Sequence, residues 1–321
     1  MPPEVKLAIT VCLIVGSMVL GYVARRARLA SERLAEILMT LVVVCGYPPV
    51  AFLSIWGLGR VSVSDVWLPV LGAGHWFLMA MAGLAVGKLM TSDRPRVGTL
   101  GLAAGAGNTG FTMGGFVVFV LHGQRGLGLV SIYCLMWMPM MVLMLYPIAR
   151  RFSPGQAPAP MGRLMVKSLF DWRSIGLPVA IVALILLVNG VKRPQAVSDW
   201  HVVDVLMYAV TATAYFSIGL RLHAAHFLSA WRSIAALAAL RFGLGAAVGL
   251  GLAALTVLTP WPLGALSRKV FLIESFVPTA VTMVAVCNMF GLRPREASVL
   301  FIANTLTYLA LVLPVVVWLL G

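Results

Sequence analysis

The sequence predicts an all-α polytopic membrane protein, and three observations carry this prediction. Of the 321 residues, 61% are apolar and only 11% are charged, and the mean hydropathy is +0.98. A soluble domain carries roughly 25% charged residues, so water cannot be the solvent of most of this surface. Long apolar runs alternate with short basic connections, which is the pattern of successive transmembrane helices.

Ten apolar runs are long enough to cross a hydrocarbon core, which requires about 20 mostly apolar residues. The first run ends at Arg25-Arg26 and is too long for the apolar core of a signal peptide, so we interpret it as a retained helix. The expected spans are 5–24, 34–56, 66–89, 99–121, 127–149, 175–192, 201–221, 231–258, 269–290 and 297–320.

The distribution of basic residues predicts the orientation. The connections after odd-numbered spans hold 16 lysines and arginines, whereas the opposite side holds 7. The positive-inside rule therefore places the odd connections in the cytoplasm and both termini outside it, in a bacterial inner membrane. The net charge of +14 then reflects topology and attraction to the lipid bilayer, and we expect no nucleic-acid partner.

The longest connection, a cytoplasmic linker over 150–174, divides the chain at its middle. Its Pro- and Ala-rich segment 153–160 is typical of a flexible linker. Residues 1–149 and 175–321 then form two halves of five spans each. Because five is odd, the second half must insert upside down relative to the first, which predicts two inverted five-helix repeats, a common transporter architecture.

Span 4 is interrupted by glycine. Seven glycines lie within 98–115, and a glycine costs a helix interior about 1 kcal/mol relative to alanine. We expect the helix to break at Gly107, Gly114 and Gly115. Close packing of small residues would account for the glycines alone. It does not account for the polar residues among them, which are Asn108, Thr109 and Thr112.

Span 9 carries Pro278, which lacks a backbone donor and interrupts a helix. Spans 4 and 9 hold corresponding positions in the two halves, and two interrupted helices in such positions indicate a transporter site. We expect them to cross near the membrane midplane, where the N-termini of half-helices favour an anion. The expected substrate-binding residues are Asn108, Thr109, Gly110, Thr112, Pro278, Thr279 and Thr282.

The segment Gly107-Asn108-Thr109-Gly110-Phe111 resembles the Asn-Thr-Gly-Phe segment of the auxin efflux carrier family, within the bile acid/auxin carrier-like superfamily. The C-terminal part is similar to that family as well, from Pro278-Thr279-Ala280-Val281 through Phe290-Gly291-Leu292 to Asn304-Thr305-Leu306. The chain departs from the family pattern at Gly115, where the family usually has a proline.

This resemblance implies the ten-helix fold with crossed, broken helices 4 and 9. It also implies a scaffold of helices 1, 2, 6 and 7 and a mobile transport unit that moves like an elevator. Members of the family move small organic anions, namely auxin in plants and dicarboxylates such as malate or malonate in bacteria.

Of the ionisable residues inside predicted spans, three are candidates for ion coupling or charge balance. Arg241 in span 8 is either bound to a carboxylate or carbonyl, or it is the counter-charge of a bound anion or a gate to the site. Glu274 in span 9 either forms a solvated ion pair with Lys269, or lines the cavity and carries a coupling proton. His75 in span 3 corresponds to Arg241 in the repeat, and is either a packing residue or a proton relay.

Catalysis and cofactor binding find no support in the sequence. The chain has no P-loop, HExxH or GxSxG motif and no paired nucleophile and base, so we expect no enzyme activity. The four cysteines lie singly in apolar runs without ligand spacing, so we expect no metal site, disulfide or cofactor.

We therefore predict a secondary active transporter of a small organic anion such as a carboxylate, working by elevator-like alternating access. Two alternatives stay open, a sodium- or proton-coupled symporter of a larger amphipathic anion and an anion channel. A coupling proton or sodium ion and a homodimer are compatible with the sequence.

Overall fold

The structure is a computed structural model of residues 1–321, and it describes all of them except 1, 156–159, 161, 164–165, 167–173 and 223–229. It is 82% helical, without a strand among the described residues, as the composition predicts. Much of the predicted linker 150–174 lies outside the described residues, so the division of the chain into two halves stays a prediction.

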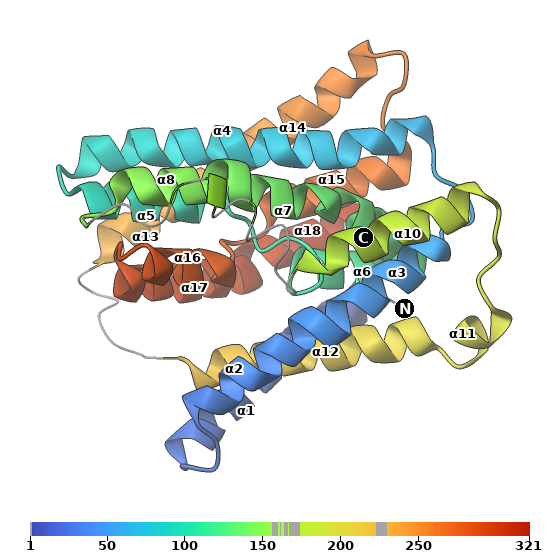
Figure 1. Cartoon of the computed structure of the whole chain (residues 1–321), viewed down its shortest axis with the longest axis horizontal. Helices are drawn as coiled ribbons and strands as arrows, with labels where there is room; N and C mark the ends of the chain where they lie inside the picture. The colour runs from blue at the N-terminus through green and yellow to red at the C-terminus, as the bar shows by residue number, and fades with distance from the viewer. Residues whose placement is uncertain (1, 156–159, 161, 164–165, 167–173, 223–229) are drawn as a thin grey trace.

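The first half of the chain contains eight α-helices (Figure 1). They are α1 (Pro3–Arg26), α2 (Glu32–Leu41), α3 (Tyr47–Trp56), α4 (Trp67–Met90), α5 (Arg94–Gly105), α6 (Gly114–Tyr133), α7 (Trp137–Met140) and α8 (Tyr146–Phe152). The described helices of the second half are α10 (Gly176–Val188), α11 (Gln195–Asp199), α12 (Val202–Leu220), α13 (Trp231–Ala238), α14 (Gly245–Leu255), α15 (Ala265–Phe276), α16 (Val281–Met289), α17 (Pro294–Thr307) and α18 (Leu313–Leu320).

Short π-helical segments join several of these helices into longer ones. Three of them run directly into prolines, namely η1 (Val42–Gly46), η4 (Met141–Leu145) and η9 (Tyr308–Val312), which precede Pro48, Pro147 and Pro314. A proline cannot donate the helical hydrogen bond and its ring needs space in the preceding turn, so a wider turn there is expected. The fourth, η7 (Ala239–Leu244), contains Arg241.

Seven of the described helical stretches are long and apolar enough to cross a membrane. They are Glu4–Arg26, Arg33–Trp56, Val63–Met90, Gly114–Phe152, Val202–Leu220, Trp231–Leu258 and Pro294–Leu320, and the shorter apolar helix Gly176–Val188 coincides with predicted span 6. Predicted spans 4 and 9 do not qualify because each is broken, so that α5, α15 and α16 have only 12, 12 and 9 residues. The count of ten therefore stays a prediction.

The helices form two groups in Figure 1. The first group, α1, α2, α3, α10 and α12, lies along the bottom and at the right of the view, where α1 packs along α12 and α3 along α10. The second group contains α4 to α8 and α13 to α18, with α4 on α5 and α14 on α15. Small residues allow the α1–α12 contact, because a Cβ on Gly21 or Gly219 would overlap a backbone carbonyl of the facing helix.

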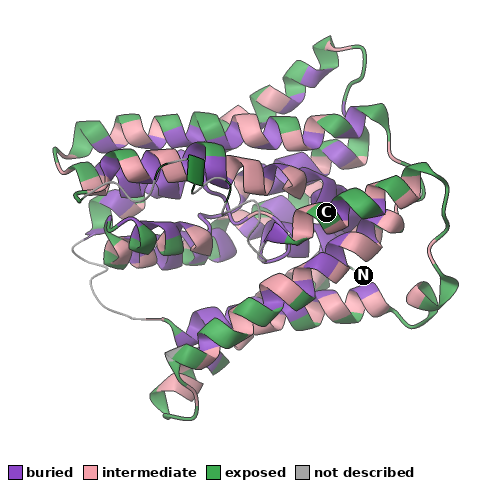
Figure 2. Ribbon diagram, viewed as in Figure 1, coloured by how far each residue is buried: buried purple, intermediate pink, exposed green. Residues whose placement is uncertain are grey.

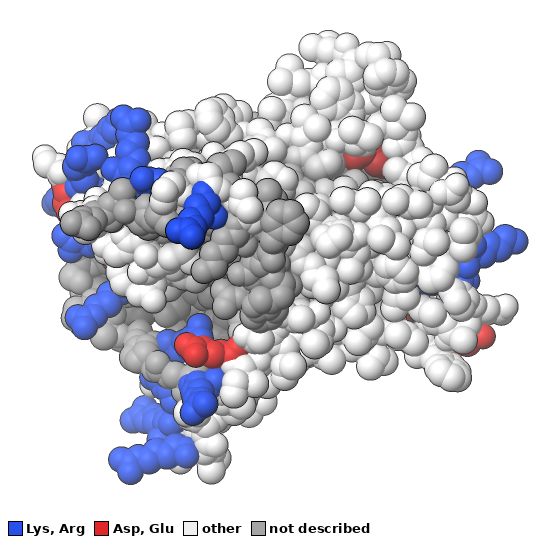
Figure 3. Space-filling model, viewed as in Figure 1, with Lys and Arg blue, Asp and Glu red and all other residues white. Residues whose placement is uncertain are grey.

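Burial and charge are distributed as a membrane protein requires. The buried residues lie where the helices meet, and large apolar side chains such as Leu20 and Ile185 are exposed on the outer faces (Figure 2). Lipid is the solvent that suits such faces. Lysines and arginines gather mainly at one end of the molecule, the left end in Figure 3. We call this end, where α1 ends at Arg26 and α5 begins at Arg94, the basic end.

Candidate functional site

The two broken helices meet at a crossing inside the second group. After α5 the chain is extended at Ala106, and after α15 it is extended at Val277. The two extended segments pair in antiparallel fashion, because Asn108 N donates to Pro278 O at 2.7 Å and Ala280 N donates to Ala106 O at 2.8 Å. The breaks predicted in both spans thus lie side by side and satisfy each other's backbone groups.

Local sequence explains the first break. Gly110 has φ +77°, a conformation that other residues rarely adopt. A Cβ on Gly107 would lie 2.6 Å from Arg241 Nη2, and one on Gly114 would overlap the Glu274 carboxylate. Gly115 N donates to Gly110 O, a bond that a proline at this position could not make. Gly107 and Gly114 therefore admit polar atoms that any side chain would displace.

Arg241 holds the ends of both half-helices. Its Nη1 donates to Ala104 O at 3.0 Å, its Nε donates to Val277 O at 3.1 Å, and its Nη2 also donates to Val277 O. These carbonyls stand at the C-terminal ends of α5 and α15, which carry partial negative charge. The guanidinium is fully buried and does not line the cavity described below. Its observed partners are carbonyls, one of the two interpretations that the sequence left open.

Glu274 lies on the other side of the crossing, fully buried. Its Oε2 accepts a hydrogen bond from Gly110 N at 3.3 Å, and its Oε1 has no hydrogen-bond partner among the described residues. The solvated ion pair with Lys269 is absent, because Lys269 Nζ donates to Gly321 O at the chain end. A carboxylate buried with one open oxygen is a group that can exchange a proton.

His75 is placed behind the crossing, close to Arg241. Its Nε2 lies 3.0 Å from Gly245 O, and its Nδ1 has no partner among the described residues. The ring is fully buried and does not line the cavity. Burial and the contact with Gly245 O fit a hydrogen-bonded packing residue, and the role of proton relay stays a prediction.

A cavity of about 650 Å³ lies beside the crossing. Both helix groups line it, the first with residues such as Tyr47 and Leu177 and the second with the loop 107–112 and with Thr282. It extends to Arg221 and Pro294 at the basic end. Because its walls belong to two groups, a relative movement of the groups would change its access.

Three polar atoms at this cavity are buried and find no hydrogen-bond partner of good geometry among the described residues. They are Asn108 Nδ2, Thr109 Oγ1 and Thr282 Oγ1. Asn108 is oriented by Thr112, whose Oγ1 donates to Asn108 Oδ1 at 2.5 Å. An unmatched buried polar group costs about 1–3 kcal/mol, so these atoms are suited to hydrogen-bond a ligand.

Two predicted binding residues serve the crossing and do not line the cavity. Pro278 O accepts a hydrogen bond from Asn108 N, and Thr279 N donates to Asn304 Oδ1 at 2.8 Å. Gly110 and Thr112 do line it. The predicted set is therefore divided, with the residues of the span 4 loop and Thr282 facing the cavity.

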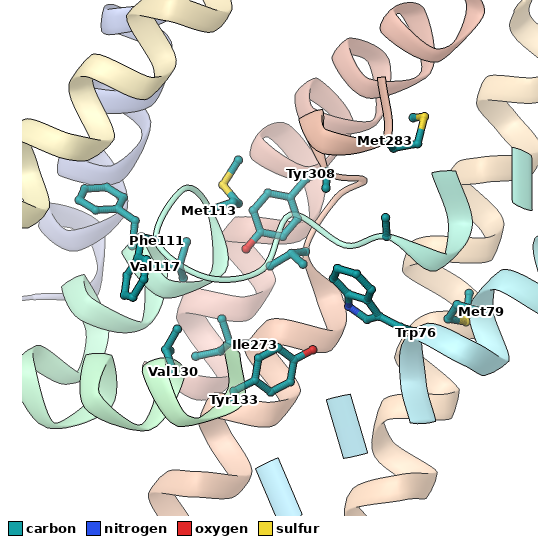
Figure 4. Close-up of a cluster of buried hydrophobic side chains, with 14 of the residues drawn as sticks. Trp76, Met79, Phe111, Met113, Val117, Val130, Tyr133, Ile273, Met283 and Tyr308 are labelled. Atoms are coloured by element: carbon teal, nitrogen blue, oxygen red, sulfur yellow. The ribbon is translucent and has the colours of Figure 1, made fainter. Parts of the chain in front are cut away.

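Sequence reasoning missed the residues that the first group contributes. Tyr47 stacks against Phe111 with ring centroids 5.3 Å apart, and Thr211 Oγ1 donates to Phe111 O at 3.3 Å. In the sequence, Tyr47 and Thr211 stood out only as an aromatic and a polar residue inside apolar spans. Buried aromatic side chains surround the crossing, including Trp76, Tyr133 and Tyr308 (Figure 4).

Comparison with known proteins gives one result. The family model described as membrane transport protein matches residues 7–319, which is nearly the whole chain, while a search of curated proteins finds no match. Together with the apolar spans, this match makes the chain a multi-pass membrane protein. The chain belongs to the membrane transport protein family, the family of the auxin efflux carriers.

Proposed function

We propose that this protein is a secondary active transporter that carries a small organic anion by alternating access. The observation that carries the proposal is the set of buried, unmatched polar groups, on Asn108, Thr109 and Thr282, at a cavity beside two crossed broken helices. The anion's carboxylate would accept hydrogen bonds from Asn108 and Thr109. No step of this proposal involves covalent chemistry, which agrees with a protein that is not an enzyme.

The proposal includes ten membrane spans in two inverted repeats. Spans 4 and 9 are both broken and pair with each other. Spans 5 and 10 both contain a π-helical segment followed by a proline, at Met141–Leu145 and at Tyr308–Val312. Such matched irregularities support a repeat, because helix defects arise from particular residues and rarely recur by packing alone.

The first helix group would be the scaffold and the second the moving unit of an elevator. The crossing is formed entirely by elements of the second group, so this group can move without breaking the backbone pairing at the site. The groups also pack against each other along α3 and α6, with Tyr47 against Phe111 and Gly128 close to Ser54 O, so the movement would have to release or slide these contacts. The basic end would be cytoplasmic in a bacterial inner membrane, with both termini outside the cytoplasm.

The cavity favours an anion with an apolar body. Its walls are largely apolar, with Met39, Trp137, Leu177 and Phe301 among the lining residues. Arg221 is the single charged side chain among the described lining residues, and it lies at the basic end within 3.3 Å of Glu36. A dicarboxylate would leave its second charge without a buried partner, so we favour a monocarboxylate and keep the larger amphipathic anion as the second candidate.

The test is uptake of labelled indole-acetate, malate and malonate by proteoliposomes. Wild type is compared with Asn108→Ala and with Asn189→Ala, a matched control that removes an exposed asparagine outside the cavity. We expect saturable flux of a monocarboxylate that is lost in Asn108→Ala and kept in the control. Flux that does not saturate would indicate a channel, and no flux of any anion by folded protein would refute the anion assignment.

A further inference from the structure

Very few charged side chains are buried. Among the described residues these are Asp65, Arg241 and Glu274, together with the ionisable His75. Asp65 lies at the end opposite the basic end, where it accepts hydrogen bonds from Ser62 N and Ser267 Oγ. Arg241 and Glu274 alone lie at the crossing, and both belong to the second group, so any movement of that group moves both charges.

Arg241 and Glu274 are held apart by the crossing itself. Arg241 binds the carbonyls at the ends of α5 and α15, while Glu274 binds Gly110 N next to the start of α6. The two side chains make no ion pair with each other, yet the Tyr133 hydroxyl lies in the field of both. Arg241 is anchored by three hydrogen bonds, whereas Glu274 keeps Oε1 open. Only Glu274 can therefore change its charge easily during a transport cycle.

Apart from Arg241, the polar and ionisable groups that face Glu274 are backbone amides, two tyrosine hydroxyls, one thiol and one imidazole. Its neighbours with such groups are Gly110, Gly114, Tyr133, Cys134 and Tyr308, with Arg241 and then His75 behind the crossing. Of these, Gly110 and Cys134 line the cavity. Gly110, whose N donates to Glu274 Oε2, therefore connects this carboxylate to the cavity wall.

Charge balance then limits which states of the moving unit can cross an apolar membrane, because a net charge is expensive there. The empty unit is neutral when Arg241 is positive and Glu274 is ionised. With a monoanion bound at Asn108, it is neutral only when Glu274 is protonated. A bound anion next to Gly110 also stabilises the protonated form of Glu274, since two like charges would otherwise lie close together.

We propose that Glu274 carries one proton with each monocarboxylate, and that Arg241 is the fixed counter-charge that makes both crossings electroneutral. This inference rests on the proposed function and specifies its coupling. On one side of the membrane the Glu274 carboxylate takes a proton from water and Asn108 binds RCOO⁻. On the other side both the proton and RCOO⁻ are released, and the unit returns empty with Glu274 ionised. Glu274 and Arg241 are positioning and coupling residues that do not touch the anion.

The experiment uses proteoliposomes in which the pH gradient and the membrane potential are set independently, the potential by potassium and valinomycin. Wild type should accumulate a labelled monocarboxylate about tenfold for each unit of pH difference. It should respond neither to the imposed potential nor to sodium. Currents on a supported membrane should be absent during this uptake.

The variant Glu274→Gln distinguishes proton coupling from anion binding and movement. Because the substituted side chain is neutral, the loaded unit is still neutral but the empty unit carries the charge of Arg241. The variant should therefore keep the exchange of labelled for unlabelled anion and lose net uptake driven by the pH gradient. Asp199→Asn, which removes an exposed carboxylate on α11, is the matched control and should keep both activities.

Two results would overturn the inference while leaving the proposed function standing. Wild-type uptake driven by the potential would show that a net charge crosses. Net pH-driven uptake that persists in Glu274→Gln would place the proton elsewhere. If Glu274→Gln does not fold, the wild-type current and pH dependence decide alone. The absence of any wild-type flux would instead refute the proposed function, and this inference with it.

Discussion

Removal of the Gln124 side chain should shift the protein towards a state that is open opposite the basic end. Gln124 lies just after Gly123, where α6 bends with φ 64°. Its Nε2 donates to Asp204 Oδ1 at 2.9 Å, and its Oε1 accepts from Arg193 Nη2 at 3.2 Å. Lys6 Nζ donates to Leu121 O at 3.0 Å in the same place. These contacts tie the second group to the first at the end away from the cavity mouth.

The magnitude follows from the two hydrogen bonds of Gln124. Both partners of Gln124 are charged, and a hydrogen bond to a charged group contributes about 1.5–3 kcal/mol net when it is well buried. Because these two bonds are only partly buried, solvent screening reduces each to about 0.5–1 kcal/mol. Their loss in Gln124→Ala would destabilise the observed state by about 1–2 kcal/mol relative to one in which the groups separate at this end. Since about 1.4 kcal/mol is a factor of ten, the equilibrium between the states should shift by roughly 5- to 30-fold.

Access to the cavity can be measured by labelling Cys134, because this thiol lines the cavity and is partly exposed. With the other cysteines replaced by serine, an impermeant maleimide is added from one side of the membrane at a time. The rate of Cys134 labelling from the side opposite the basic end should rise roughly 5- to 30-fold, as long as the state open to that side is the less populated one in wild type. Gln195→Ala removes an exposed glutamine at the same end and is the control. A rate for Gln124→Ala within twofold of both wild type and control would refute the reasoning.

Three further substitutions test other parts of the structure. Gly21→Val should force α1 away from α12, because its Cβ would overlap Phe216 O, and should lower the melting temperature in detergent by an amount that corresponds to about 1–3 kcal/mol. Thr282→Val removes a cavity hydroxyl without changing shape, so KM for the anion should rise about tenfold with an unchanged melting temperature. Gly115→Pro removes the bond from Gly115 N to Gly110 O and should lower thermal stability; an unchanged melting temperature would contradict this.

The helix breaks were predictable because their causes are local. Glycine and proline weaken a helix wherever they stand, and Gly107 and Pro278 lie inside the two breaks, between α5 and α6 and between α15 and α16. Gly114 and Gly115, also expected to break the helix, are instead the first residues of α6, where the helix resumes. The loop residues Asn108 and Thr109 face the cavity for the same reason, since they stand within the break.

The partners of the charged residues were not predictable, because they are set by packing between distant segments. Arg241 finds Ala104 O, 137 residues away, and the sequence carries no mark that selects this carbonyl. For Glu274 the sequence offered Lys269, at the start of the same span, as an alternative partner. Burial of α15 decided between them, since residues 270–275 are all buried while Lys269 is partly exposed and bonds Gly321 O. Gln124 gave no signal, because its bonds depend on how the two helix groups meet.

The glycines of span 4 and the buried charges form one arrangement. Gly107 leaves room for the guanidinium of Arg241, and Gly114 leaves room for the carboxylate of Glu274. A side chain at either position would push one charge away from the backbone groups that it compensates, the carbonyl ends of α5 and α15 or the Gly110 amide. The glycine-rich segment therefore does more than break a helix. It holds two opposite charges on either side of the crossing and keeps them apart, which is the condition that the proposed coupling requires: one charge stays fixed while the other takes up a proton.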